Sequence, residues 1–582
     1  MMALGAGTVS ASQKQVWDFS HEFPQGTVTE DADGLDPSPD TSRFQFQKGD
    51  AWKVSYVDSQ DGFVAISTSW YSPKGKSNDW LILPPVTVRE ATAVLNWRAR
   101  AWDKRYSDGY KVYVAPASAT SAEDFASLTP VAEVPAENSA WTWHSVSLEA
   151  YQGQQIRVAF LNDSDNCAFL LLDDVMVGTP EPATLTLTTH AIAKPGDPIA
   201  ITGTVSSDLT QGATGLRVGY DFASRSGELS LEGQSVKLGE SVPFAFDALQ
   251  LDYSSGQRLE GNVWVEANGV RSTMPLTVTG TPNTMVMEEC TGMWCMYCVR
   301  GIVVMRNMYK AHPEAFVGIA LHSGDDMFND DGYSPYIFSM GDGAGYPFAI
   351  FNRDPAYKAD MGLAEEYFQA ISRAPLRARV DLEVILCGNE YTLTGKVVTT
   401  ELCEGGRYRL AYVFLENDVW KEGYYQKNAY ASGQDASGID MEEFNTLPPV
   451  IVDYHFNDVA RGYVLDKEGI EGSLPEVLLP GREYRHEVTV PLPDNILNPE
   501  NVEIAALLLD TTDHRIVNAT KVSLAQQTQG IGNLVTDPES PASVEIYSMQ
   551  GLRYPSLESA PAGMYIIRTV TDGKVKVAKI LK

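Results

Sequence analysis

The sequence predicts a multidomain, mainly β protein that contains one α/β segment. Most of the chain consists of short runs in which apolar and polar residues alternate, as in "YKVYVA" (110–115) and "QIRVAF" (155–160), and turns rich in Gly, Pro and Asp separate these runs. Such alternation is typical of half-buried antiparallel strands. Strand and helix patterns follow one another in β-α-β order in one stretch, residues 284–376. A chain of 582 residues is too long for one core, and its length suggests about four domains.

Turn-rich stretches set the predicted domain boundaries. "GTPEP" (178–182) ends a first strand-rich segment, and "VTGTPNT" (278–284) ends a second one. A third strand-rich segment follows the α/β segment and has a loop-rich interruption near 416–450. The predicted segments are 15–180, an Ig-like β-sandwich at 181–282, the α/β segment at 283–376, an Ig-like β domain at 377–528 and a small C-terminal β unit at 529–582.

Composition excludes several classes of partner. Apolar residues make up 44% and aromatic residues 10% of the chain, as expected for a folded protein. A formal net charge of -32 argues against nucleic acid and anionic lipid as partners, and makes cations such as Ca²⁺ natural ligands. No apolar run reaches the ~18 residues of a membrane-spanning helix, so none is predicted.

Residues 1–14 resemble the end of an export signal. A weakly apolar stretch ends in Val9-Ser10-Ala11, where the small residues have the spacing of a cleavage site, although no basic region precedes it. We expect a signal-peptide remnant and therefore an exported protein. An ordinary flexible terminus is the alternative.

The stretch "CTGMWCMYC" (290–298) holds three of the six cysteines. Cys295 and Cys298 form a C-x-x-C between the predicted strand "MVMEE" (285–289) and a predicted helix at 295–309. Free N–H groups and the dipole at a helix N-terminus favour a thiolate. We therefore expect Cys295 to be the exposed attacking thiol, and Cys298, which is further buried, to resolve the mixed disulfide.

Other roles for the cysteine pair are less favoured. The two residues are too close in sequence to constrain the fold. A zinc site needs two further ligands, but the chain has no second C-x-x-C, and its eight histidines are dispersed. Disulfide chemistry is therefore expected, and it requires no cofactor.

Three residues near the pair fit the same chemistry. Glu289 lies six positions before Cys295, where a strand carboxylate that points under the helix would accept the proton of Cys298 during exchange. Trp294 directly precedes Cys295. Pro347 in "GYPFAIF" (345–351) comes just before a strand, where a cis-proline would bring the backbone close to the reactive thiol and position a bound peptide.

These features resemble the thioredoxin superfamily. "EECTGMWCMYCVRG" (288–301), "HFNDVARG" (455–462) and "HRIVNATKV" (514–522) more closely resemble the thioredoxin-like members of the twenty-eight-kilodalton outer-membrane protein family of Bacteroidetes, over about 283–525. The resemblance implies a protein thiol or disulfide as partner. Val299 departs from that pattern, and so does Cys290, which is either a third exchanging thiol or a buried strand residue.

The first segment resembles the cleaved-adhesin or choice-of-anchor J domain, a jelly-roll sandwich. The motifs are "SNDWLILPPVTV" (77–88), the stretch 95–115 and "FLLLDDVMV" (169–177). The resemblance implies a structural Ca²⁺, for which Asp31, Asp33 and Asp173 offer oxygen ligands; solvated turn acids are the alternative. Four aromatic residues allow a sugar-stacking face or, as is more usual in a sandwich, a core: Tyr71, Trp80, Trp97 and Trp102.

The last segment resembles the C-terminal sorting domain of the type IX secretion system. "IYSMQG" (546–551), "PAGMYIIR" (561–568) and a terminal strand with alternating lysines carry this resemblance, which implies an outer-membrane, cell-surface or secreted location. The lysines also suit a charge-protected edge strand.

Two functions remain open from the sequence. The first is thiol–disulfide exchange with a protein partner by an exported surface protein. The second is adhesion, with a surface glycan or a host protein as ligand and a redox-silent C-x-x-C. Neither G-x-S-x-G nor H-E-x-x-H is present, which disfavours a hydrolase.

Overall fold

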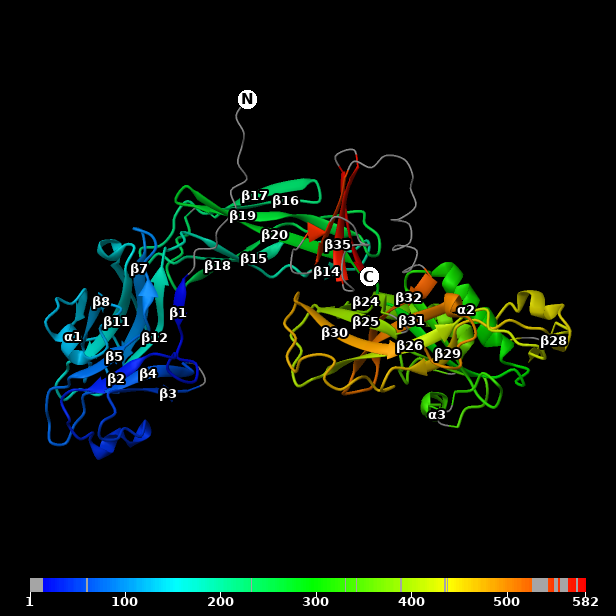
Figure 1. The fold of residues 1–582 in the computed structure, drawn as a ribbon, viewed down its shortest axis with the longest axis horizontal. Coiled ribbons are helices and arrows are strands. Elements are labelled where there is room, and N and C mark those ends of the chain that lie inside the picture. The colour runs from blue at the N-terminus through cyan, green and yellow to red at the C-terminus, as the bar shows by residue number, and fades with distance from the viewer. Residues whose placement is uncertain are drawn as a thin grey trace, which may run out of the picture. The chain divides into compact units, whose positions relative to one another are not determined.

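The protein is mainly β and multidomain, as predicted (Figure 1). A computed structural model describes residues 14–525 except 59–60, 232, 330, 342, 359, 388–389, 434–435 and 437, together with four C-terminal strands. The chain divides into two compact units. The first contains residues 1–188, 200–247 and 261–275, and the second contains residues 189–199, 248–260 and 276–582. The expected signal-peptide remnant lies almost wholly outside the described residues.

The N-terminal segment forms two antiparallel six-stranded sheets around one core. Its apolar core includes Trp97, Phe160 and Leu172. Tyr71, Trp80 and Trp97 are each at most 5% exposed, and Trp102 packs against Phe44, so these aromatic residues are core, not an exposed sugar-stacking face. The first sheet has the order β10-β7-β12-β4-β3 with β1 on β12, and the second has the order β2-β5-β11-β8-β9 with β6 on β11. Their bounds are β1 Gln15–Trp17, β2 Val28–Asp31, β3 Trp52–Tyr56, β4 Phe63–Thr68, β5 Asp79–Ile82, β6 Val86–Thr87, β7 Val94–Ala101, β8 Tyr110–Pro116, β9 Ala132–Val134, β10 Thr142–Ser147, β11 Gln155–Asn162 and β12 Phe169–Gly178, with helix α1 at Ala122–Ala126.

The next segment contains two further sheets. One has the order β13-β15-β18, and the other has the order β14-β20-β19-β16-β17, in which only β14 and β20 pair in parallel. The strands are β13 Thr184–Leu187, β14 Ile192–Ala193, β15 Thr202–Ser206, β16 Arg217–Phe222, β17 Arg225–Ser230, β18 Ser241–Ala245, β19 Arg258–Ala267 and β20 Val270–Gly280.

A mixed seven-stranded sheet organises the second unit. Its order is β23-β21-β22-β29-β26-β31-β32. Helices α2 (Val299–Ala311) and α4 (Ala364–Arg373) pack on one face, and α3 (Tyr333–Ser339) packs on the other. Successive residues of a strand point to opposite faces, so β21 contributes Met285 and Met287 to the first face and Val286 to the second. The strands are β21 Met285–Thr291, β22 Phe316–His322, β23 Phe348–Phe351, β26 Tyr408–Glu416, β29 Val459–Tyr463, β31 Val502–Asp510 and β32 Ile516–Ser523.

The α/β segment and the β segment that follows it share this sheet. β22 and β29 run parallel and pair at Ala320 and Val459. Val317 and Ile319 lie in one core with Val413 and Leu507. A three-stranded sheet of β24 (Ala378–Cys387), β25 (Glu390–Thr399) and β30 (Glu483–Pro491) covers the β26–β31 part.

The chain between β26 and β29 forms a large insertion, residues 417–458. It contains β27 (Tyr425–Lys427), a 3-10 turn at Glu442–Asn445 and β28 (Val450–Val452). At the C-terminus, β33 (Ser543–Ser548), β34 (Arg553–Tyr554), β35 (Met564–Thr571) and β36 (Lys574–Leu581) form one antiparallel sheet. None of the described helices has the length and apolar character that a membrane span requires.

Candidate active site

Cys295 and Cys298 form a disulfide at the start of α2. Their Cα atoms lie 5.4 Å apart, and Cys298 is the residue that precedes the helix. The predicted helix began at Cys295, whereas residues 295–298 form a tight turn in which Cys298 N donates to Cys295 O at 3.3 Å. Both cysteines therefore stand just outside the first helical turn.

The predicted exposure of Cys295 is wrong. The residue is only 5% exposed, and Cys298 is fully buried. Residues 426–429 of the insertion, here called the cover segment, pack along the motif. Gln426 Nε2 donates to Cys295 O at 3.0 Å, Lys427 N to Met293 O at 3.0 Å, and Ala429 N to Met296 O at 2.9 Å. The sequence analysis took this stretch for part of a loop-rich interruption and gave it no role.

Helix α2 holds the rest of the insertion in place. Val299 and Val303 of the helix share a buried cluster with Met441 and Phe444. The Arg306 guanidinium contacts the carboxylate of Glu443 at 2.6 Å and also that of Glu442. The cover segment is thus part of a packed substructure.

The residues beside Cys295 are exposed and apolar. Trp294, Met296 and Tyr297 are 39%, 44% and 49% exposed. Trp294 Nε1 donates to Ser323 O at 2.7 Å, and its ring lies 5.2 Å from the ring of Tyr346. This ring contact places the chain before β23 beside the motif. The Tyr346–Pro347 peptide bond is cis, as predicted.

Glu289 lies beneath α2. It is on β21, is 1% exposed and has its carboxylate against the Cα of Gly301. Its Oε1 has no hydrogen-bond partner among the described residues. Burial raises the pKa of Glu289 to about 8, against the lowering effect of Thr291, so the carboxyl group keeps its proton at neutral pH. The position under the helix is the one that the sequence predicted.

The neighbouring Glu288 points to the opposite face and is fully paired. Its carboxylate accepts hydrogen bonds at 2.8, 2.9 and 3.2 Å from the guanidinium of Arg353 and one at 2.5 Å from Tyr333 Oη. Cys290 is completely buried in the core on the same face as Glu288, and burial raises the pKa of its thiol. This location favours the interpretation of Cys290 as a buried strand residue.

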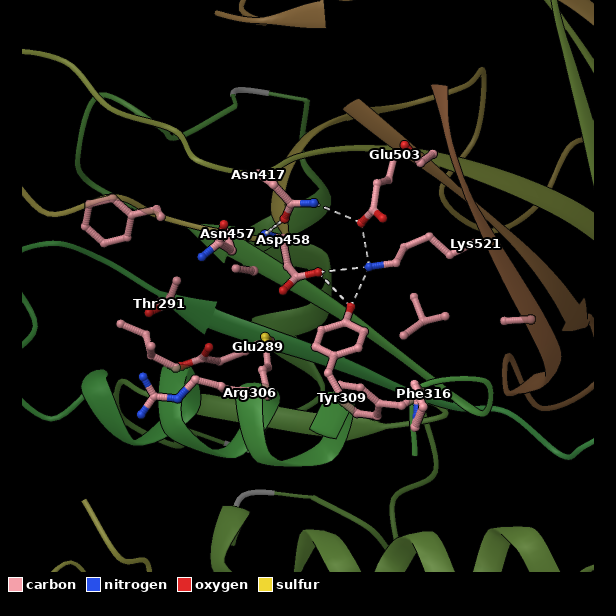
Figure 2. A pocket seen from close by; sticks show the side chains of 18 of the residues that line it. Glu289, Thr291, Arg306, Tyr309, Phe316, Asn417, Asn457, Asp458, Glu503 and Lys521 are labelled. Atoms are coloured by element: carbon pink, nitrogen blue, oxygen red, sulfur yellow. Dashed lines mark hydrogen bonds and ion pairs between the residues drawn. The ribbon is translucent and has the colours of Figure 1, made fainter. Parts of the chain in front are cut away.

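A cavity of about 590 Å³ lies between α2, the sheet and the end of the insertion (Figure 2). Glu289 is part of its lining. On another wall, Tyr309 Oη donates to Asp458 Oδ1 at 2.6 Å, and Lys521 Nζ lies 2.7 Å from Tyr309 Oη and 2.6 Å from Glu503 Oε2. Five elements supply these side chains, namely β21, α2, the end of the insertion, β31 and β32, so local patterns did not reveal the cavity.

The acidic cluster of the N-terminal segment differs from the predicted calcium site. Ligand oxygens of Asp31, Asp33 and Asp79 lie within 4.8 Å of one another. Asp173 instead pairs with Arg98 at 2.7 Å, on the sheet that holds β7 and β12. Asp79 therefore takes the place of Asp173 as the third carboxyl group of the cluster. Burial, helped by repulsion from Asp33 and Asp31, raises the pKa of Asp79 to about 8. Three converging carboxyl groups with a buried member fit a Ca²⁺ ion.

Comparison with known proteins yields similar folds at low identity. No family model and no curated protein matches the chain. HBP35 of Porphyromonas gingivalis is similar at 15% identity and a TM-score of 0.31, over 52% of this chain and 98% of HBP35. The K1 cleaved adhesin domain of Lys-gingipain from the same organism is similar at 20% identity and a TM-score of 0.22, over 28% of this chain and 97% of the domain. The K3 cleaved adhesin domain of the same protein is similar at 18% identity and a TM-score of 0.23, over 29% of this chain and 99% of the domain. Likenesses this weak carry no information on function.

Proposed function

We propose that this chain is an exported surface protein that exchanges disulfides with a protein partner through Cys295 and Cys298, in a thioredoxin-like module. The observation that carries the proposal is the C-x-x-C disulfide at the start of α2, beside the cis Tyr346–Pro347 bond and above the buried Glu289. A disulfide between residues so close in sequence constrains little of the fold, which leaves exchange as its use.

The exchange begins on the oxidised form. A thiolate of the partner attacks Sγ of Cys295, the Cys295–Cys298 bond breaks, and Cys298 leaves as a thiolate. A second partner thiolate then attacks the mixed disulfide and releases Cys295. The partner loses two electrons and gains a disulfide, and the two cysteines of this chain become thiols. The reverse sequence reduces a partner disulfide.

Glu289 is proposed to supply the proton that the leaving Cys298 needs. A carboxyl group with a pKa of about 8 is protonated at pH 7 and gives up its proton without a large driving force. Its position against Gly301 puts it under the first turn of α2, which Cys298 precedes. In the reverse direction the same carboxylate accepts the proton.

The partner has to reach a largely covered sulfur. Trp294, Met296 and Tyr297 offer apolar surface next to Cys295, and Pro347 lies beside Trp294 through Tyr346. We propose that an extended apolar segment of the partner docks there, with Trp294 and Pro347 as positioning residues, and that the cover segment limits which partners approach.

Reduction of insulin by the full chain in the presence of dithiothreitol tests the activity. Cys295→Ser is expected to abolish it, and Cys403→Ser, which changes a buried cysteine outside the site, is expected to retain it. Equal activity of Cys295→Ser and the unaltered chain would refute exchange at this site and favour the adhesive function.

Export to the outer membrane, the cell surface or the medium is proposed from the sequence patterns of 1–14 and 530–582. Protease accessibility of the chain on intact cells of its native host tests this. Protection from protease until the cells are broken would contradict a surface location.

A further inference from the structure

The cavity behind α2 has the size of a small-molecule site. Its volume of about 590 Å³ falls within the range of roughly 300–1,000 Å³ that ligand pockets occupy. Apolar and aromatic side chains form part of the wall, among them Met305, Phe316, Tyr454 and Phe456, and polar side chains form the rest. Figure 2 shows Glu289 and Asp458 on separate walls of this space.

The two cations that line the cavity are already paired with carboxylates. Lys521 Nζ contacts Glu503 at 2.6 Å and Asp458 at 3.1 Å, and the Arg306 guanidinium contacts Glu443 at 2.6 Å. An anionic ligand would have to compete with these ion pairs. The lining therefore does not favour an anion.

Glu289 is a buried lining group with one carboxylate oxygen that lacks a partner. It is 1% exposed, its Oε1 accepts no hydrogen bond within the described chain, and no cation acts on its carboxyl group. A buried polar atom without a partner is costly, and a ligand that donates a hydrogen bond to it removes that cost. A cationic donor also compensates the charge of the ionised carboxylate.

Aromatic side chains suit the same ligand. Tyr454 and Phe456 line the cavity, and the ring of Tyr309 already has a cation, Lys521 Nζ, 4.4 Å from its centroid. Aromatic faces attract ammonium groups and pack against apolar bodies.

We propose that this cavity binds a small organic ammonium ion, whose nitrogen contacts Glu289 and whose apolar body packs against Tyr454 and Phe456. The site shares Glu289 with the proposed exchange reaction, but its ligand would occupy the cavity and not the surface at which a partner protein would meet Cys295. The inference does not depend on disulfide exchange.

Binding has a proton signature. Burial keeps Glu289 protonated at pH 7, and an ammonium ion stabilises its ionised form, so binding releases the proton to solvent. The other titratable groups that face the cavity come from every surrounding element. They are Arg306 and Tyr309 from α2, Glu314 between α2 and β22, His322 from β22, Tyr454, His455 and Asp458 from the end of the insertion, and Glu503 and Lys521 from β31 and β32.

Calorimetric titration of the full chain with benzylamine at pH 7, in two buffers of different ionisation enthalpy, tests the proposal. Benzyl alcohol serves as the neutral analogue. We expect benzylamine to bind at least about tenfold more tightly than benzyl alcohol and to release nearly one proton. No binding, equal affinity for both compounds, or binding without proton release overturns the proposal, and these outcomes need no variant.

Variants then locate the ligand. Glu289→Gln is expected to lower benzylamine affinity about tenfold and to abolish proton release, whereas Glu366→Gln, an exposed acid on α4, is expected to change neither. Proton release that persists in Glu289→Gln overturns the assignment. The double variant Cys295→Ser/Cys298→Ser is expected to bind benzylamine normally, which separates this site from the exchange reaction.

Discussion

The carboxylate of Glu289 occupies the space that a side chain at Gly301 would need. A Cβ built on Gly301 would overlap both oxygens of Glu289, although the two residues belong to different elements, β21 and α2. The buried Glu289 therefore requires a glycine at position 301 of the helix above it.

Gly301→Ala is expected to destabilise the second unit. The overlap costs about 1–3 kcal/mol, of which the better helix propensity of alanine offsets about 1 kcal/mol. The thermal midpoint of the purified variant measures the result. Gly345→Ala, where a Cβ would meet open space, is the matched control. If Gly301→Ala is as destabilising in a Glu289→Ala background as in the native one, the two residues are not coupled.

Glu289→Gln is expected to change how stability depends on pH. The folded state raises the pKa of Glu289 from 4.5 to about 8, so the folded chain binds more protons than the unfolded chain between those values. Stability therefore falls as pH rises from about 4.5 to about 8, by at most about 4–5 kcal/mol from this group. Calorimetric melts at pH 5 and pH 8 should show a smaller loss for Glu289→Gln than for the unaltered chain. An identical loss would mean that the carboxyl group titrates normally.

Glu288→Gln, unlike Glu289→Gln, is expected to destabilise the protein at pH 7. It leaves the buried Arg353 without its counter-charge, and breaking a buried pair in this way costs about 3 kcal/mol or more. Chemical denaturation of both adjacent Glu→Gln variants measures the contrast. Equal stability of Glu288→Gln and Glu289→Gln would contradict the assignment of the two residues to opposite faces with different partners.

Gln426→Ala is expected to expose Cys295. It removes the side-chain hydrogen bond to Cys295 O, which lowers the free energy needed to open the cover segment by about 1 kcal/mol. The reduced cysteine should then react about fivefold faster with iodoacetamide. Gln369→Ala on α4 should leave the rate unchanged. Alkylation at the native rate in Gln426→Ala would show that the cover segment does not control access.

Calcium is expected to stabilise the N-terminal segment through Asp79. Saturating Ca²⁺ at about 100 times the dissociation constant adds about 2.7 kcal/mol, which raises the melting temperature, and EGTA reverses the rise. Asp79→Asn should abolish this increase, and Asp173→Asn should retain it because Asp173 pairs with Arg98. Loss of the calcium effect in Asp173→Asn alone would restore the ligand set predicted from sequence.

Local patterns were sufficient for the mainly β fold class and for the position of Glu289 under α2. Strand alternation indicated the mainly β class, and the spacing from Glu289 to Cys298 indicated an acid under the helix that follows the cysteine pair. The same patterns could not reveal contacts between distant segments. Gln426 covers Cys295 from 131 positions away, and Lys521 meets Tyr309 from 212 positions away. Nor could the sequence show that the carboxyl group of Asp79, and not that of Asp173, lies close to those of Asp31 and Asp33.

The pairing of β22 with β29 sets the shortest fragment worth expressing. A fragment that ends at residue 376 would lose four of the seven strands of the sheet, β29, β26, β31 and β32, and would leave Val317 and Ile319 without Val413 and Leu507. Such a fragment would expose an unpaired strand edge and an apolar sheet face to other copies of itself and would aggregate. Recombinant work on the cysteine pair should therefore retain the chain through Ala525.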